Sequence, residues 1–383
     1  MRHFRLCLLL LILVLPLLAG CPFEKADQRI VLWTDRSEFA AYAQAFNSSQ
    51  EDYKVEVVYK ASPAGELTKK NPGRWDVAVG PFLNAPEISE ILMPLEPLFS
   101  DGTLDKSQFY QSALEKGGRN SHQMLLPVSF NIPAFMFQAG SIKPEFDSFA
   151  LSADSFDQIC LDFNKAKSRH AKSAFSPLWN PESAFFFALL SEGLSAEHQN
   201  IEAGRNQVHQ MIESLCGSAK EELRFREKYL YKNSLELLDS GHILFWYSDV
   251  GHFYSLPAER RRTLDFRCYQ NHSGKIAVCE DMLWLGIPKK GGNLKGAVAF
   301  IKWMMDPQVQ QNLILNARTM DIRSFGLAGG FSSIKKVNTE SLPKLYPFIN
   351  GSIPREELIM FPAPCQPDWY AVKKDTVIPR IIQ

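Results

Sequence analysis

Three short apolar runs near the start of the chain, at 29–33, 55–59 and 75–79, do most to limit the folds available to it. Each run has the length and composition of a buried strand. Between the first two runs, apolar side chains recur at the spacing of one helix face: Phe39, Tyr42, Ala43 and Phe46. Strand, helix and strand joined by short connections favour a parallel sheet with right-handed crossovers. The start of the chain is therefore predicted to be α/β.

The rest of the chain continues with more helix. Helical apolar spacing occupies 154–167, 181–192 and 201–231, and further strands are predicted at 243–247 and 282–287. The chain has 383 residues, 45% hydrophobic and 22% charged, which is ordinary globular composition with room for two domains or one large one. Lysine plus arginine and aspartate plus glutamate both number 42, so no basic excess points to a nucleic-acid partner.

The first residues have the layout of an export signal. Arg2 and Arg5 precede an apolar stretch at 6–18, which is shorter than the roughly 20 residues that span a bilayer. The stretch ends in Leu18-Ala19-Gly20-Cys21, which resembles the lipobox of bacterial lipoproteins, where the cysteine is diacylated. We expect a signal peptide at 1–20, a lipid on Cys21, and a polar tether at 21–28 that holds the protein outside the cytoplasmic membrane. A plain signal peptide or an uncleaved anchor is the alternative.

Export changes the interpretation of the remaining cysteines, which are Cys160, Cys216, Cys268, Cys279 and Cys365. Their number is odd, so at least one lacks a partner within the chain. Cys268 and Cys279 flank a predicted turn at 271–274, so a disulfide across a hairpin and two free thiols are both open at this point. A metal site is not expected, because the sequence has no CxxC pair and its eight histidines lack ligand spacing.

Several segments, in chain order, resemble one known family. They are the strand and helix at 30–47, the strand at 75–80, the Met93-Pro94-Leu95-Glu96-Pro97-Leu98 and Leu126-Pro127-Val128-Ser129-Phe130-Asn131 runs, and the block at 284–310. Together they resemble the extracellular solute-binding proteins of ABC importers, family 1, the sugar-binding type. The resemblance covers most of 29–325 and is most specific at 284–310. The stretch Phe137-Gln138-Ala139 departs from the Tyr-Asn-Lys of many members, at the expected hinge.

The resemblance implies a two-lobed α/β periplasmic-binding-protein fold of type II-like topology, with a ligand cleft between lobes joined by hinge strands. Lobe 1 is then expected at 29–137 and 285–325, lobe 2 at 138–284, and a C-terminal segment at 326–383 packing on lobe 2 or across the hinge. The implied function is capture of a small solute, with a carbohydrate favoured, and delivery to an ABC permease. No enzyme activity and no cofactor are expected, and we expect a monomer.

Ligands of open α/β sheets bind outside the carboxyl ends of the strands, and sugars need aromatic platforms beside polar groups. Asp35, with Glu38 three residues later, is also the predicted N-cap of the first helix. Trp246 fits a platform and buried packing equally well. On these grounds the predicted ligand-binding residues are Asp35, Arg36, Asn131, Trp179, Trp246, Tyr247, Asp249, Asp281, Trp284 and Arg323.

Two other classes of function compete with the importer interpretation. A ligand sensor or adhesin on the same scaffold is the stronger rival, because fold does not fix function. An exported hydrolase is weaker, since the chain has no GxSxG, HExxH or P-loop motif, and Ser332-Ser333-Ile334-Lys335 matches S-x-x-K without its companion motifs. An amino-acid ligand would want a paired arginine and aspartate, such as Arg323 with Asp35 or Asp249.

Overall fold

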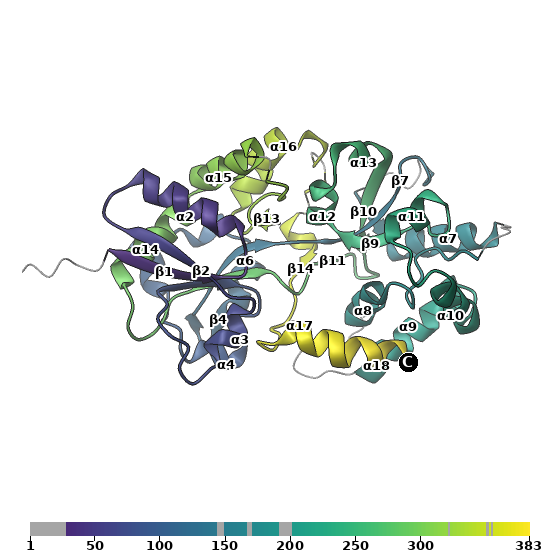
Figure 1. Ribbon diagram of the computed structural model, residues 1–383, viewed down its shortest axis with the longest axis horizontal. Coiled ribbons are helices and arrows are strands. Elements are labelled where there is room, and N and C mark those ends of the chain that lie inside the picture. The colour runs from purple at the N-terminus through teal and green to yellow at the C-terminus, as the bar shows by residue number, and fades with distance from the viewer. Residues whose placement is uncertain are drawn as a thin grey trace, which may run out of the picture.

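Two separate sheets lie toward opposite ends of the long axis of the molecule and divide it into two lobes (Figure 1). The computed structural model describes residues 28–143, 149–166, 171–190, 201–320, 322–349, 352–353 and 355–383. The predicted signal peptide, Cys21 and almost all of the tether lie outside these residues. Among the helices described, none is both long enough and apolar enough to cross a bilayer.

The first sheet has six strands in the order β13-β6-β12-β3-β1-β2. Their bounds are Arg29–Thr34 (β1), Lys54–Tyr59 (β2), Val77–Gly80 (β3), Leu126–Phe130 (β6), Leu283–Gly286 (β12) and Phe331–Ser332 (β13). β1 pairs in parallel with β2 and β3, whereas β12 is antiparallel to β3 and β6. The parallel α/β start predicted from the sequence is confirmed, although β3 begins at Val77 rather than at residue 75.

The helices of the first lobe follow the predicted apolar pattern. The buried face of α2 (Glu38–Ser49) consists of the four predicted residues, and its Phe46 packs edge-on against Phe300 of α14 (Leu294–Met304). The carboxylate of Asp306 caps α15 (Pro307–Thr319) by accepting two backbone N–H groups, as the Asp-Pro pair indicates. Shorter elements of the chain are α3 (Pro63–Leu67), α4 (Pro86–Ser89), α5 (Glu96–Ser100), α6 (Gln111–Lys116), β4 (Gly118–Arg119), β5 (His122–Gln123) and α16 (Leu342–Leu345).

The second sheet has four strands in the order β8-β10-β7-β9, at Ala150–Ser152, Leu264–Gln270, Pro133–Gln138 and Trp246–Asp249. Most of the helices of this lobe come from the middle of the chain, as predicted. They are α7 (Ala153–Lys165), α8 (Pro181–Leu190), α9 (Ile201–Leu215), α10 (Ala219–Lys228), α11 (Ser234–Asp239), α12 (Val250–Ser255) and α13 (Ala258–Thr263). Its core is aromatic, with the ring of Phe135 on β7 packed against Phe156 and Phe187.

Two local predictions are wrong. The run at 243–247 is not a strand throughout, because the backbone of Leu244 and Phe245 bonds to Ala174 O and regular pairing starts only at Trp246. Asp35 is not the cap of α2, since the helix begins after Ser37 without a side-chain cap. The carboxylate of Asp35 instead lies 3.5 Å from Nε of Arg36.

The chain passes between the two sheets at several points. The first crossing is Asn131-Ile132, between β6 and β7, so the chain changes sheet a few residues before the expected boundary at 137. The second is 278–282, which leads from β11 (Ile276–Ala277) to β12. β11 itself pairs in parallel with β14 (Ile359–Met360), so the C-terminal segment lies beside this crossing.

The chain ends in a helical segment that reaches both lobes (Figure 1). It comprises α17 (Trp369–Val372), one π-helical turn (Lys373–Val377) and α18 (Ile378–Ile382), and is called the C-terminal helix below. α18 packs against α8 and α9 of the second lobe. Just before α17, the carbonyl of Pro367 accepts a hydrogen bond from the Ser62 hydroxyl of the first lobe.

Candidate functional site

A cleft of about 770 Å³ borders the second sheet, the second crossing and the C-terminal helix. Its walls are built from the residues before and in α8, the strand β9 with the start of α12, the crossing at 279–281, and the C-terminal helix. The lining residues are Trp179, Asn180, Pro181, Glu182, Ser234, Trp246, Tyr247, Ser248, Asp249, His252, Cys279, Glu280, Asp281, Tyr370, Lys373 and Lys374.

Three aromatic side chains of the second lobe face this cleft, and all are half-buried. The indole N–H of Trp179 donates to Tyr229 O at 2.9 Å, which fixes its ring. Trp246, at the start of β9, has its ring 5.2 Å from that of His252 in an edge-on arrangement. Tyr247 packs on the aromatic core through Phe186, and burial raises the pKa of its phenol well above the ordinary value. Fixed aromatic faces of this kind can stack on the C–H face of a sugar.

Asn131 and Asp249 join the first crossing to β9. Nδ2 of Asn131 donates to Asp249 Oδ1 at 2.5 Å and to Gly329 O at 3.2 Å, and its Oδ1 accepts from the N–H of Gly251. Asp249 also caps α12 by accepting from His252 N at 2.8 Å. Burial raises the pKa of Asp249, although the bond from His252 N opposes this. Asn131 is thus engaged with Asp249, Gly251 and Gly329 and does not line the cleft.

The backbone near this pair is packed closely enough to require glycine. A Cβ on Gly251 would lie 2.4 Å from Gly329 O and 2.5 Å from Nδ2 of Asn131. No real Cβ makes contacts this short, so a side chain here would push the crossing away from α12.

Lys373 of the C-terminal helix lies between two carboxylates. Its Nζ is 2.6 Å from both Glu182 of α8 and Glu280 of the second crossing, and 4.2 Å from the ring centroid of Phe185. Burial disfavours the charge of Lys373, but the two carboxylates outweigh burial and raise its pKa. The three side chains fix the C-terminal helix to the floor of the cleft.

Asp281 links the C-terminal helix to the first lobe. Its Oδ2 accepts from the Tyr370 hydroxyl at 3.0 Å and lies 3.5 Å from Nη2 of Arg36. The ring of Tyr370 packs edge-on against Phe82, with centroids 4.9 Å apart. Burial raises the pKa of Asp35, on the far side of Arg36, while the guanidinium lowers it.

The structure brings half of the predicted site residues together in the cleft: Trp179, Trp246, Tyr247, Asp249 and Asp281. Asp35 and Arg36 lie behind Asp281, and Asn131 lies in the crossing. Trp284 is removed from the candidates, because β12 is covered on both faces and its ring is 1% exposed. Arg323 follows α15 in the first lobe and is not among the residues that line the cleft.

Sequence reasoning missed the contribution of the C-terminal helix and of the acids beside it. Tyr370, Lys373, Glu182 and Glu280 all line the cleft, yet none stands at a strand end or in a recognised motif. The only signal was compositional, since Trp369-Tyr370 puts aromatics near a Lys-Lys pair at the end of the chain.

Of the two alternatives left open for Cys268 and Cys279, the structure shows the second, since both are free thiols. The turn at 271–274 forms, but β10 then pairs with β7 and β8, while the next segment pairs with β14. Cys268 is fully buried opposite Ala134, whereas Cys279 faces the cleft. The described residues also contain no group of three or more His, Cys, Asp or Glu side chains placed to hold a metal ion.

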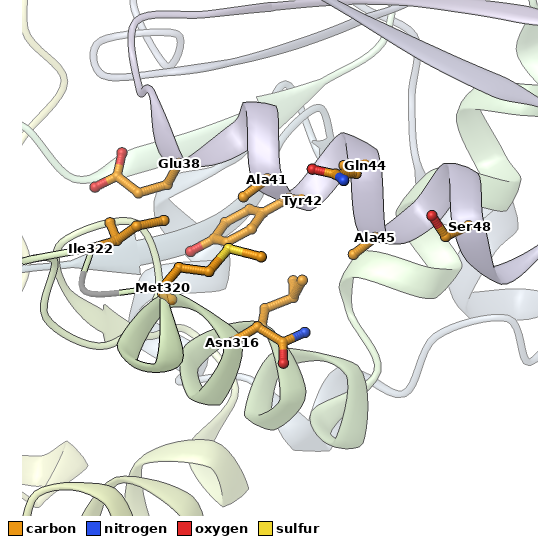
Figure 2. A pocket seen from close by; sticks show the side chains of 11 residues that line it. Glu38, Ala41, Tyr42, Gln44, Ala45, Ser48, Asn316, Met320 and Ile322 are labelled. Carbon is orange, nitrogen blue, oxygen red and sulfur yellow. The ribbon is translucent and has the colours of Figure 1, made fainter.

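A second hollow, of about 180 Å³, lies in the first lobe between α2 and α15 (Figure 2). Figure 2 shows Tyr42 and Glu38 of α2 on one side and Asn316 and Met320 on the other. The Tyr42 hydroxyl accepts from Ala328 N, and Glu38 accepts from the Ser324 hydroxyl. Because this hollow is small and both Tyr42 and Glu38 are already hydrogen-bonded within the chain, the larger cleft is the candidate site.

No family model and no curated protein matches the sequence. Solved structures, in contrast, match nearly the whole chain. The sugar-binding protein MalE from the phytopathogen Xanthomonas citri aligns with a TM-score of 0.67 and 13% identity over 93% of this chain and 92% of that one. An ABC substrate-binding protein from Listeria monocytogenes, in complex with cycloalternan, aligns with a TM-score of 0.58 and 12% identity over 92% and 93%.

One similar structure is an enzyme. Thiaminase I of Clostridium botulinum, in complex with thiamin, aligns with a TM-score of 0.64 and 11% identity over 92% of this chain and all of that one (100%). The same architecture therefore carries both binding proteins and a catalyst. With two sheets, two lobes and a cleft beside the crossings, the chain has the periplasmic-binding-protein fold that these sugar-binding and substrate-binding proteins share.

Proposed function

We propose that this protein is the lipid-anchored substrate-binding component of an ABC importer, which captures a carbohydrate in the cleft and delivers it to a membrane permease. The observation that carries the proposal is the cleft itself, where half-buried aromatic faces stand beside hydroxyl, amide and carboxylate groups. This combination suits a ligand with apolar C–H faces and many hydroxyls. The volume of about 770 Å³ falls within the range of small-molecule sites.

The crossings support a role in transport. Two crossings beside a cleft allow the lobes to rotate around a ligand, and a permease can distinguish the resulting conformations. The anchor is inferred from Leu18-Ala19-Gly20-Cys21, and it would place the protein on the outer side of the cytoplasmic membrane. A sensor or adhesin with the same cleft remains the second candidate, favoured by the fold alone.

The chemistry of the most reactive groups does not favour an enzyme. Burial, together with Asp249 and Asp281, raises the pKa of the Cys279 thiol, so a nucleophilic thiolate is disfavoured in the cleft. Ser332 of the S-x-x-K match is 1% exposed and bonds to Gln310, while Lys335 pairs with Glu356. Neither Ser332 nor Lys335 is placed to attack a substrate.

A thermal-shift panel on the full-length protein tests the proposal. The detergent must lack a sugar headgroup, and the panel holds oligosaccharides, polyols, amino acids and short peptides. A ligand at 100 times its Kd stabilises the fold by about 2.7 kcal/mol, and we expect a rise of several degrees in Tm with one carbohydrate group.

A pair of variants tests whether the ligand binds in the cleft. Trp246→Ala should abolish the shift, whereas Tyr59→Ala, which removes an exposed aromatic ring on the edge strand β2, should preserve it. A shift with peptides alone, or none with any solute, would transfer support to the sensor or adhesin.

A further inference from the structure

The charged side chains of the cleft are divided unevenly between acids and bases. Among the described residues that line it, four are carboxylates and two are lysines: Glu182, Asp249, Glu280, Asp281, Lys373 and Lys374. Whether a ligand meets a positive or a negative surface therefore depends on how the two lysines and the neighbouring arginine are engaged.

Lys373 is committed to the protein. Its ammonium contacts Oε2 of Glu182 and Oε1 of Glu280, both at 2.6 Å, and its side chain is 13% exposed. Each contact uses one oxygen, so the second oxygen of either carboxylate can accept a hydrogen bond. Lys374 is exposed to solvent, where a single ammonium group contributes little to recognition.

Arg36, which lies against the lining residue Asp281, is also engaged within the chain. It lies 3.5 Å from Asp35 on one side and 3.5 Å from Asp281 on the other. Arg323, the arginine considered for an amino-acid ligand, belongs to the first lobe beyond α15 and does not line the cleft.

Residues at the starts of α8 and α12 line the cleft, and each helix start already has an acid of the chain beside it. Glu182 lies in the first turn of α8. Asp249 caps α12, accepting from His252 N. Asp249 thus takes the place of an anion at the start of α12, and Glu182 puts a negative charge at the start of α8, which disfavours an anionic ligand there.

We infer that the cleft selects a polyhydroxy ligand without acidic groups, and that Lys373, by holding Glu182 and Glu280 at the cleft floor, sets this preference. The inference rests on the proposed function and narrows its ligand class. Neutral hydroxyls donate charge-assisted hydrogen bonds to carboxylates. A uronate, a sugar phosphate or an amino-acid carboxylate meets like charge without a buried cation to receive it. Lys373 is a positioning residue, because it acts through the two carboxylates.

The test compares neutral oligosaccharides with their oxidised forms. Calorimetric titration of the full-length protein uses maltotriose, mannotriose and cellotriose, each beside the derivative in which the C6 hydroxyls are converted to carboxylates. We expect the uronate of the best neutral ligand to bind at least about tenfold more weakly than its parent.

Variants test which residues cause the difference in affinity between the neutral oligosaccharide and its uronate. Glu182→Gln should narrow the gap between the neutral and the oxidised ligand, whereas Glu202→Gln removes an equal charge from the exposed face of α9 and should leave it unchanged. Lys373→Met should weaken the neutral ligand, and Lys373→Arg should restore much of its affinity, since a guanidinium can contact both carboxylates.

The outcomes separate the inference from the function on which it rests. A uronate that binds as tightly as its parent, or more tightly, overturns the inference and leaves carbohydrate capture standing. A Glu202→Gln variant that narrows the gap as much as Glu182→Gln also overturns it, because selection would then follow net charge. If no oligosaccharide of either kind binds, the proposed function fails and the inference falls with it.

Discussion

Asn131, Asp249 and Gly251, where the first crossing meets α12, form one polar cluster beside the cleft, called the hinge cluster below. Glu182, Glu280 and Lys373 form another, called the helix cluster. The hinge cluster bonds largely to backbone groups, whereas the helix cluster joins three side chains from three distant segments. Groups bonded to backbone are costly to disturb. In the helix cluster each carboxylate keeps a second oxygen that can accept a hydrogen bond from a ligand, so we expect stability to depend more on the hinge cluster and ligand affinity more on the helix cluster.

The largest expected effect is on the hinge cluster. Gly251→Ala places a Cβ against Gly329 O, and we expect the free energy of unfolding to fall by about 3 kcal/mol, the upper end of overpacking costs. Chemical denaturation measures the loss. Gly102→Ala is the control, because its site has open space and only an unfavourable φ of +77°. Equal losses in the two variants would show that the close approach at Gly251 is unimportant.

Asn131→Ala should have the next largest effect. It leaves the Gly251 N–H and one side of Asp249 without partners, and we expect a loss of about 2 kcal/mol. Affinity per folded molecule should change little, since Asn131 does not line the cleft. A large loss of affinity with unchanged stability would mean that Asn131 contacts the ligand after all.

Lys373→Met should show the reverse of the Asn131→Ala pattern, with a small loss of stability and a larger loss of ligand affinity. Glu182 is half-exposed and can be solvated, so only Glu280 is left poorly paired, and we expect a stability loss of about 1 kcal/mol. The effect on ligand affinity should exceed the effect on stability, as denaturation and calorimetry on the same preparation would show. A large loss of stability with unchanged ligand affinity would show that the helix cluster, like the hinge cluster, stabilises the fold and does not contribute to binding.

A smaller effect should appear in the pH dependence of stability. The pKa of Asp249 is raised above its ordinary value of 3.8 by burial, so the folded state binds its proton more tightly than the unfolded chain does. The contribution of Asp249 to stability is therefore greatest below pH 3.8 and declines as the pH rises through the raised pKa. Asp249→Asn should flatten this part of the stability profile. A stability profile identical to that of the parent would show that the pKa of Asp249 does not differ between the folded and unfolded states.

The smallest effect concerns the thiols. Cys268 lies in β10 opposite Ala134, whereas Cys279 lies in the second crossing, so a thiol titration after denaturation should detect both as reduced. Peptide mass mapping without reductant identifies them. A Cys268–Cys279 peptide would require the region around β10 and the second crossing to be rearranged.

Much of the fold was predictable because its signals are local. The apolar face of α2 and the Asp306-Pro307 start of α15 lie within one or two helical turns, where periodicity and capping operate. The helix cluster was not predictable, since Lys373 and Glu280 are 93 positions apart and meet only through packing of the C-terminal helix. Trp284 shows a related limit, because a strand sequence does not tell whether helices cover one face of its sheet or both.

The C-terminal helix also makes one wall of the cleft depend on a segment that contacts both lobes. Its start is hydrogen-bonded to Ser62 in the first lobe, its last turns pack on α8 and α9 in the second, and between them it presents Tyr370 and Lys373 to the cleft. One wall of the cleft is thus encoded downstream of every strand of the two main sheets. We expect a variant that lacks residues 369–383 to keep both sheets and to lose the wall that Tyr370 and Lys373 form.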